Sequence, residues 1–194
     1  MVKSTGKTKI KTAVFISGRG SNLKSLIKFA NLKKSPIQIK LILSTNNRAK
    51  GLSFARKHNI KYKTFKFEDK TRDEMNVLKY LNKNEISLIC LAGFMKILSI
   101  NFIKKFNGKI LNIHPSLLPS YKGLNTHQRV IKSKEKFSGC TVHFVNSRLD
   151  AGKIIMQKKI KVKKNDTAKS LASRILKQEH VLYPKALGKL FFNR

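Results

Sequence analysis

Apolar residues fall along this chain in two patterns, short continuous runs and stretches in which they recur every three or four positions. The continuous runs are partly β-branched, which is typical of strands buried on both faces of a sheet. We expect such strands at residues 12–17, 37–44, 86–91 and 109–113, and a weaker strand at residues 61–67.

The stretches with helical spacing lie between the expected strands. After the first strand, Leu23, Leu26, Ile27 and Ala30 follow the i, i+3, i+4, i+7 pattern of one helix face. In the helix expected over residues 72–82, Met75, Leu78 and Leu81 should face the core. Together the patterns predict further helices over residues 51–57, 72–82 and 99–106.

The pattern changes in the last third of the chain. Side chains of different polarity alternate with a period of two over residues 140–146, and residues 153–162 continue as a strand after a short loop. This arrangement predicts an antiparallel hairpin. A last helix is expected from residue 167 to about 182, with Asp166 as its N-cap and Pro184 as a break or kink.

The fold class follows from this order of elements. Alternating strands and helices build a parallel sheet through right-handed crossovers. We predict an α/β fold, a Rossmann-like, mostly parallel twisted sheet with flanking helices and a C-terminal antiparallel hairpin. The 194 residues suit one domain, placed at residues 12–194 after a basic N-terminal tail at residues 1–11.

The large positive net charge changes the predicted function little. Lys and Arg number 43 against 9 Asp and Glu, a formal net charge of +34, and such a protein attracts polyanions. The basic residues, mostly lysines, are spread over the whole length without an aromatic-rich binding stripe. We therefore interpret most of them as solvated surface and do not expect a nucleic-acid partner.

The cysteines and the lengths of the apolar runs indicate the cellular compartment of the protein. Cys90 and Cys140 are too few for a disulfide framework and lack the spacing of a structural zinc site. No apolar run approaches the roughly 18 residues that span a bilayer. We expect a cytoplasmic protein with no membrane segment and no metal.

A glycine-rich loop, SGRGSN at residues 17–22, joins the first strand to the first helix. Glycines let backbone amides approach an anion, and a helix N-terminus adds free N–H groups and a positive dipole end. Leu23 replaces the last glycine of a dinucleotide fingerprint, and no Walker lysine follows. The loop predicts a phosphate or carboxylate site; the alternative is a tight turn without a ligand.

Asn112 and His114 carry the strongest chemical signal. They lie two positions apart at the end of an expected strand, so both side chains leave one face where α/β sheets place ligands. An amide donor beside an imidazole can stabilise an oxyanion on a carbonyl carbon while the histidine moves a proton. This pair favours acyl-type transfer, although a strand-end histidine bonded to backbone is also possible.

Asp150 is the candidate carboxylate partner, because it is an acid among turn residues outside the expected helices. It could equally be a turn aspartate bonded to its own backbone. His143 fits a structural role as well as a site role, and His127 and His58 are expected on the surface. Residues 92–98 offer an apolar wall, and Glu179 could recognise an amine or hydroxyl. One substrate should be phosphorylated and the other partly aromatic.

Six motifs carry a resemblance over nearly the whole chain. In order and spacing they resemble the phosphoribosylglycinamide formyltransferase family of purine biosynthesis. They are ISGRGSNL (16–23), LAGFMKIL (91–98), LNIHPSLLP (111–119), TVHFV (141–145), LDAG (149–152) and QEHxxYP (178–184).

The resemblance implies transfer of formyl from 10-formyltetrahydrofolate to the amine of glycinamide ribonucleotide. It implies His114 as general acid at the formyl oxygen and Asn112 as oxyanion donor. Asp150 would keep His114 protonated and position the water that relays the amine's proton. The implied ribonucleotide site comprises Gly20, Ser21, Asn22, Gly93, Met95, Pro115 and Glu179. The implied folate site comprises Arg72, Phe94, Met95, Lys96, Ile97, Leu98, Asn112, Val145, Asn146, Leu149 and Asp150.

Some features depart from the family. Lys96 stands where an arginine often follows Phe-Met, and Asn125 stands where some members have histidine. Three alternatives stay open: methionyl-tRNA formyltransferase-like activity, formyltetrahydrofolate hydrolase activity, and a non-catalytic nucleic-acid-binding protein. We expect no added tRNA-binding or regulatory domain, and either a monomer or a homodimer.

Overall fold

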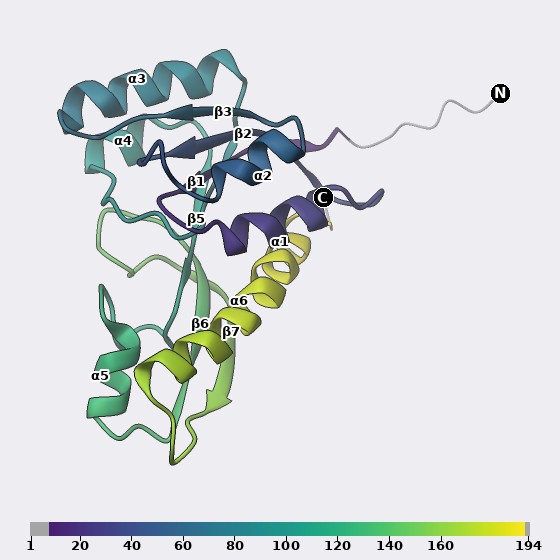
Figure 1. The fold of residues 1–194 in the computed structure, drawn as a ribbon. Coiled ribbons are helices and arrows are strands. Elements are labelled where there is room, and N and C mark those ends of the chain that lie inside the picture. The colour runs from purple at the N-terminus through teal and green to yellow at the C-terminus, as the bar shows by residue number, and fades with distance from the viewer. Residues whose placement is uncertain (1–7, 193–194) are drawn as a thin grey trace.

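The computed structural model describes residues 8–192, and a seven-stranded sheet with order β3-β2-β1-β4-β5-β6-β7 forms its centre (Figure 1). The described strands are β1 (Ile10–Ile16), β2 (Ile37–Ser44), β3 (Lys61–Thr64), β4 (Leu88–Leu91), β5 (Lys109–His114), β6 (Phe137–Phe144) and β7 (Ile154–Lys161). The described helices are α1 (Ser21–Ala30), α2 (Leu52–Lys57), α3 (Lys70–Lys83), α4 (Ile100–Lys105), α5 (Thr126–Lys132) and α6 (Ala168–Phe191).

The pairing of the strands confirms the predicted fold class. β1 to β5 pair in parallel, and β6 and β7 then join antiparallel. The chain builds outward from β1 to β3 and returns to β4 on the other side of β1. Such a reversal opens a crevice at the carboxyl ends of the strands, where open α/β sheets bind ligands.

Alternation along the strands supplies two cores, one on each face of the sheet. Val14 and Ile16 face a core that also holds apolar side chains of α1, α2, α5 and α6. Ala13 and Phe15, on the opposite face, pack with α3 and α4. The helices therefore flank the sheet on both sides, as predicted, and fix the strand ends that carry the site.

The expected boundaries differ from the structure in several places. β1 begins at Ile10, two residues before the expected domain start, and residues 1–7 of the expected tail lie outside the described residues. α5 has no counterpart among the expected helices, and β3 ends at Thr64. Met75 is wrong as an inward residue, because its side chain is 45% exposed while Leu78 and Leu81 are buried.

The last helix corrects two further expectations. α6 continues through Pro184 to Phe191, and its N-cap is Thr167 rather than Asp166. Thr167 and Ser170 form a reciprocal capping box, which satisfies free N–H groups of the first turn. Asp166 instead accepts hydrogen bonds from Lys163 and Ser170 and pairs with Arg174. No helix among residues 8–192 is long and apolar enough to cross a membrane.

Candidate active site

The carboxyl end of β5 presents Asn112 and His114 on one face of the sheet. In the antiparallel register, Asn112 lies opposite His143 and His114 opposite Thr141 of β6. His114 is 5% exposed and His143 is 2% exposed. The register thus brings two imidazoles and one amide together at the strand end.

Asp150 completes this cluster from the loop between β6 and β7. Its carboxylate Oδ2 lies 3.3 Å from His114 Nδ1 and accepts a hydrogen bond of 2.9 Å from the backbone N–H of Gly123. Its Oδ1 lies 3.5 Å from Asn112 Nδ2, which donates to it. The Asp150 side chain is only 8% exposed, and its backbone is left-handed, with φ of 46°. One carboxylate therefore contacts both residues that the sequence singled out.

The loop between β5 and α5 contacts the cluster through its backbone. His114 Nε2 lies 2.9 Å from the carbonyl oxygen of Tyr121, and because a carbonyl only accepts, this nitrogen donates. Ser116 Oγ donates to the Ser120 carbonyl at 2.7 Å within the same loop. Neither Tyr121 nor Gly123 was predicted as part of the site, because the irregular loop has no hydrophobic period to reveal its position.

The loop after β1 lies beside the loop after β4 at the point where the strand order reverses. Ser17 N donates to the Gly93 carbonyl at 3.1 Å, and Ser17 Oγ accepts from Met95 N at 2.9 Å. Gly20 has φ of +73°, and a Cβ there would lie 2.5 Å from Gly51 Cα, so this turn requires glycine. The N-terminal amides of α1, which have no helical acceptors, follow directly.

Comparisons with known proteins place this geometry in a family. A profile of the formyl transferase family matches residues 10–187. Phosphoribosylglycinamide formyltransferase of Haemophilus influenzae is 40% identical over 177 residues, covering 90% of this chain and 84% of that protein. The chain belongs to the formyl transferase family.

Solved structures and longer relatives agree with this family. A crystal structure of phosphoribosylglycinamide formyltransferase from Anaplasma phagocytophilum has a TM-score of 0.89 and 43% identity, covering 96% of this chain and 88% of that one. The human trifunctional purine biosynthetic protein adenosine-3 is 41% identical over 184 residues, 93% of this chain. This chain spans only 18% of that trifunctional protein's length.

In this member of the family, His143 also belongs to the cluster, a question that the sequence left open. Its Nδ1 donates to the Phe144 carbonyl at 2.8 Å, and burial lowers the pKa of the imidazole despite the opposing effects of Phe144 and Asp150. The neutral ring therefore carries its proton on Nδ1 and accepts at Nε2. Asn112 Nδ2 donates to that nitrogen at 3.3 Å, so His143 orients the Asn112 amide.

Replacing His143 by phenylalanine should lower kcat about tenfold, because the Asn112 amide loses the acceptor that orients it. KM should change little, and the unpaired Phe144 carbonyl should cost about 1–3 kcal/mol of folding stability. Steady-state kinetics and urea unfolding measure both effects. His58→Phe is a matched control, because His58 is exposed at the end of α2. Unchanged kcat in a folded His143→Phe variant would exclude the orienting role.

Two other expectations about histidine and cysteine are resolved. His127 is half-buried on α5 rather than a surface residue, and its pKa is lowered by burial and by the charge of His114. Cys90 and Cys140 are free and buried, and burial raises the pKa of each thiol to about 12. Neither thiol is therefore activated as a nucleophile. Among the described residues, no group of His, Cys, Asp and Glu could hold a metal ion.

Glu179 of α6 meets Asn22 of α1 in a buried polar pair. Asn22 Nδ2 donates to Glu179 Oε2 at 2.7 Å, and the two side chains are 6% and 7% exposed. Burial raises the pKa of Glu179, partly offset by the Asn22 hydrogen bond. Asn22 Oδ1 is buried and has no hydrogen-bond partner within the described part of the chain. The pair therefore keeps one acceptor free beside the glycine-rich loop.

Glu179→Gln should stabilise the folded protein at alkaline pH. Burial favours the neutral carboxyl, so the folded state binds this proton more tightly than the unfolded chain. Stability from this group is present below the ordinary glutamate pKa and is lost as the pH rises through the raised value. Glutamine stays neutral at every pH. In urea unfolding, the free energy of unfolding of the variant relative to the wild type should therefore be higher at about pH 8 than at about pH 4. The same difference at both pH values would contradict this prediction.

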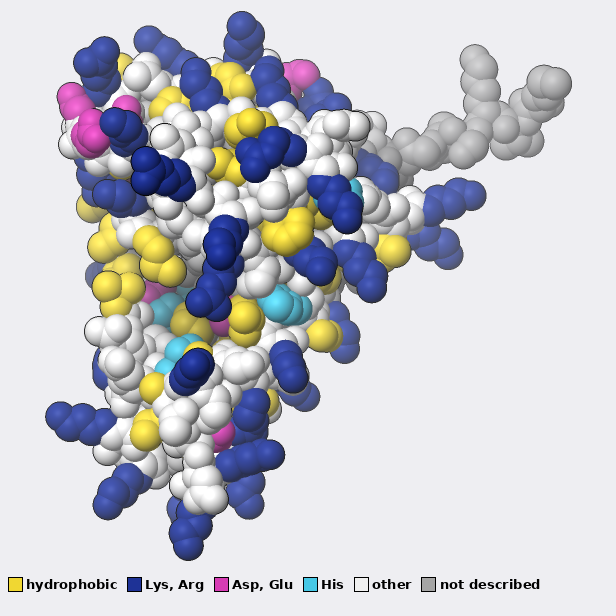
Figure 2. All heavy atoms as spheres, viewed as in Figure 1, with side chains coloured by type: hydrophobic (Ala, Val, Ile, Leu, Met, Phe, Trp, Pro, Cys, Tyr) yellow, Lys and Arg dark blue, Asp and Glu magenta, His cyan; other side chains and the backbone are white. Residues whose placement is uncertain are grey.

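The expected folate wall at residues 92–98 contains one aromatic residue, Phe94, in the loop after β4. Phe94 packs against Phe15 and Phe67, with ring centroids 5.4 and 5.8 Å apart. In Figure 2, histidine and acidic side chains meet in the middle of this face, beside hydrophobic ones. The exposed hydrophobic side chains of this region are Met95, Ile97, Leu124 and Leu149.

The remaining expected folate residues differ in exposure. Leu98 is 6% exposed, so its side chain packs in the core. Arg72, Lys96 and Asn146 are exposed, and Val145 is half-buried. Arg72 lies in the first turn of α3, which Asp69 caps by accepting from its backbone N–H. Leu124 was not predicted, because it lies in the irregular loop before α5.

Proposed function

We propose that this formyltransferase moves the formyl group of 10-formyltetrahydrofolate to the amine of glycinamide ribonucleotide. The carrying observation is the Asp150 carboxylate, which contacts both His114 and Asn112 at the carboxyl end of β5. Relatives named phosphoribosylglycinamide formyltransferase, which match most of the chain, support the choice of substrates.

The proposed reaction is an addition followed by an elimination at the formyl carbon. The ribonucleotide amine attacks this carbon and forms the new C–N bond, and negative charge develops on the formyl oxygen. Asn112 Nδ2 and protonated His114 donate to that oxygen. The bond to N10 of the folate then breaks, N10 takes a proton, and the amine's proton leaves through a water positioned by Asp150.

The proposed mechanism would exchange some of the contacts that His114 and Asn112 make in the structure. Asp150 faces His114 Nδ1, so Nε2 is the nitrogen that would serve the formyl oxygen. Nε2 donates here to the Tyr121 carbonyl, which the formyl oxygen would replace. Asn112 Nδ2 would keep its 3.3 Å contact with His143, and its 3.5 Å contact with Asp150 is long enough to be given up for an oxyanion.

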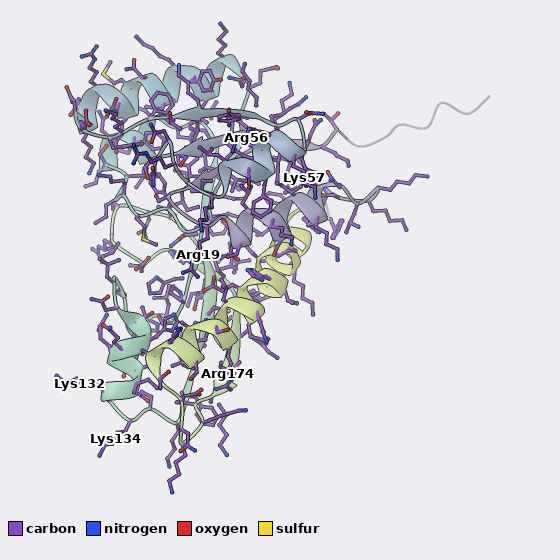
Figure 3. All side chains as sticks on the ribbon, viewed as in Figure 1. Arg19, Arg56, Lys57, Lys132, Lys134 and Arg174 are labelled. Carbon is purple, nitrogen blue, oxygen red and sulfur yellow. The ribbon has the colours of Figure 1, made fainter. Side chains whose placement is uncertain are left out.

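The two substrates would approach from neighbouring loops. The ribonucleotide phosphate would bind the amides of Gly20, Ser21 and Asn22 at the start of α1. Arg19 projects beside this helix start (Figure 3). Glu179 and the free Asn22 Oδ1 would accept hydrogen bonds from the sugar or glycinamide part. The pteridine would lie against the apolar wall, with Arg72 near the glutamate tail.

A spectrophotometric deformylation assay with 10-formyl-5,8-dideazafolate tests the proposal. Glycinamide ribonucleotide, initiator methionyl-tRNA and water are offered as acceptors in separate reactions. Turnover with the ribonucleotide alone is expected. Turnover with tRNA alone or with water alone would replace the proposed acceptor, and no turnover with any of them would leave only the non-catalytic alternative. The cytoplasmic location, the absence of a metal and the oligomeric state stay predictions.

A further inference from the structure

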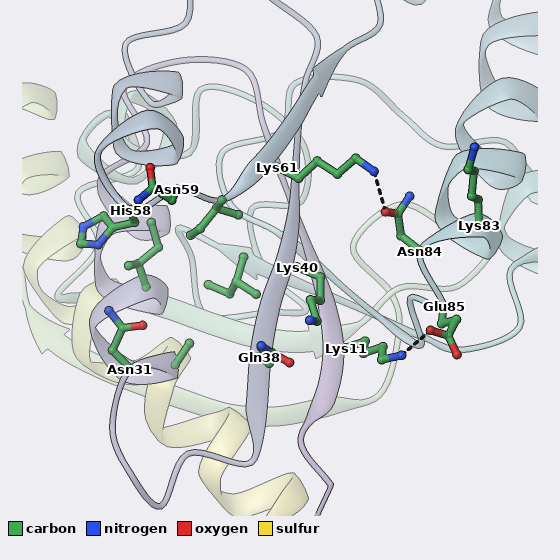
Figure 4. A pocket seen from close by; sticks show the side chains of 14 residues that line it. Lys11, Asn31, Gln38, Lys40, His58, Asn59, Lys61, Lys83, Asn84 and Glu85 are labelled. Atoms are coloured by element: carbon green, nitrogen blue, oxygen red, sulfur yellow. Dashed lines mark hydrogen bonds and ion pairs between the residues drawn. The ribbon is translucent and has the colours of Figure 1, made fainter.

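A cavity of about 630 Å³ opens at the amino ends of the strands, opposite the end that carries the candidate active site (Figure 4). It exists because β3 starts late. β2 pairs with β1 from Ile37 onward, whereas its pairing with β3 begins only at Leu41 opposite Lys61. The first residues of β2 therefore have no strand on their outer side.

Three helices end around this gap. The C-caps of α1, α2 and α3 are Asn31, His58 and Asn84, and all three residues line the cavity. The residues that follow each helix satisfy many of its last carbonyl groups, as where Ile60 N donates to the Ala55 carbonyl. The side-chain amides on the rim therefore supply the groups that can hydrogen-bond a ligand.

The lining divides into two chemically different halves. Figure 4 shows Asn31, His58 and Asn59 on one side and Lys61, Lys83 and Asn84 on the other. The first half also has an apolar floor that belongs to the core beneath α1 and α2. The lysines of the second half are Lys11, Lys40, Lys61 and Lys83.

The positive charge of the lysine half is only partly neutralised. Glu85 is the one acid in the lining, and its pairing with Lys11 lowers its pKa. Lys61 donates to Asn84 Oδ1 at 3.1 Å. The Lys83 ammonium group has no hydrogen-bond or ion-pair partner among residues 8–192. Of the four lysines only Lys83 lies on a helix, so helix dipoles do not account for the cluster.

We propose that this cavity binds a nucleoside polyphosphate. The base and ribose would lie against the apolar and amide half, and the phosphates would lie among the lysines. The volume falls within the roughly 300–1,000 Å³ of small-molecule sites, and charge-assisted bonds from ammonium groups suit phosphate oxygens. Enclosure by three helix ends favours a single nucleotide over a nucleic-acid chain. The proposal is independent of the formyl-transfer reaction.

Equilibrium binding of a fluorescent N-methylanthraniloyl ATP to the full chain tests this site. Fluorescence anisotropy at physiological salt, with saturating glycinamide ribonucleotide in the active site, should show one bound nucleotide per chain. Lys40→Gln combined with Lys83→Gln should raise Kd about tenfold or more, because two phosphate contacts are lost. Both lysines are exposed, so the fold should be unaffected, which circular dichroism checks.

A second double variant controls for the charge of the whole protein. Lys132→Gln with Lys134→Gln removes the same charge at the distant end of α5 (Figure 3) and should change Kd less than about twofold. Equal weakening in both double variants would show non-specific attraction and overturn the proposal.

Competition experiments define the ligand. Unlabelled ATP should displace the probe at lower concentration than inorganic triphosphate, because the triphosphate lacks the groups that occupy the apolar half. Equal competition by triphosphate would overturn the nucleoside part of the proposal. Displacement by a single-stranded RNA oligonucleotide at lower nucleotide concentration than ATP would make the surface a nucleic-acid site instead.

Discussion

Replacing His114 by alanine should lower kcat for formyl transfer by about 10²–10⁴, the range typical of a lost general acid. The imidazole is the group beside Asp150 that can donate a proton to the formyl oxygen. KM for both substrates should stay within a few-fold, since the loss concerns the transition state. Steady-state kinetics with both substrates varied measures this split.

The matched control for this prediction is His58→Ala, which removes an exposed imidazole at the other end of the sheet and should leave kcat unchanged. Combining His114→Ala with Asp150→Asn sharpens the test. If the two residues act as one unit, the double variant should lose little more than the worse single variant. Full additivity would separate their roles, and wild-type kcat in folded His114→Ala would remove His114 from the mechanism.

Asn112→Ala should lower kcat by about 10²–10³, the cost of removing one oxyanion donor. His143, 3.3 Å from Asn112 Nδ2, orients the amide, and the N–H group that contacts Asp150 at 3.5 Å is the one that the oxyanion would accept from. The loss should be the same at every pH at which the wild type is active, because the amide does not titrate.

Asn165→Ala is a suitable control, since Asn165 is exposed in the loop before α6. Thermal unfolding of both variants shows whether the fold is intact. A raised KM with unchanged kcat in Asn112→Ala would identify Asn112 as a binding residue rather than an oxyanion donor.

Strongly periodic segments could be predicted from the sequence. Residues 37–44 form β2 with the expected bounds, because apolar residues alternate with exposed Gln38 and Lys40 in its first half and run continuously in its second. α5 could not be found in this way, because among its seven residues only Thr126 and Val130 are buried. α6 was expected to break at Pro184, yet burial of Tyr183, Ala186 and Leu187 on both sides of that residue holds the helix together.

The candidate site also contains residues that could be predicted from the sequence and residues that could not. Asn112 and His114 could be placed together because strand spacing fixes their direction. Asp150 was expected as their partner from its turn setting and from the family resemblance, and its contact with His114 depends on the whole path from β6 to β7. The contributions of Tyr121 and Gly123 come from their backbone, which no side-chain pattern encodes. Contacts of this kind require the folded chain.

The left-handed backbone of Asp150, with φ of 46°, narrows the set of substitutions that this position tolerates. Asparagine and glycine adopt this conformation readily, whereas a longer or β-branched residue is strained there. Neither of the two tolerated residues carries a negative charge. A random mutational scan should therefore find that position 150 tolerates almost no substitution. The proposed role requires a carboxylate, and the left-handed backbone favours aspartate over glutamate.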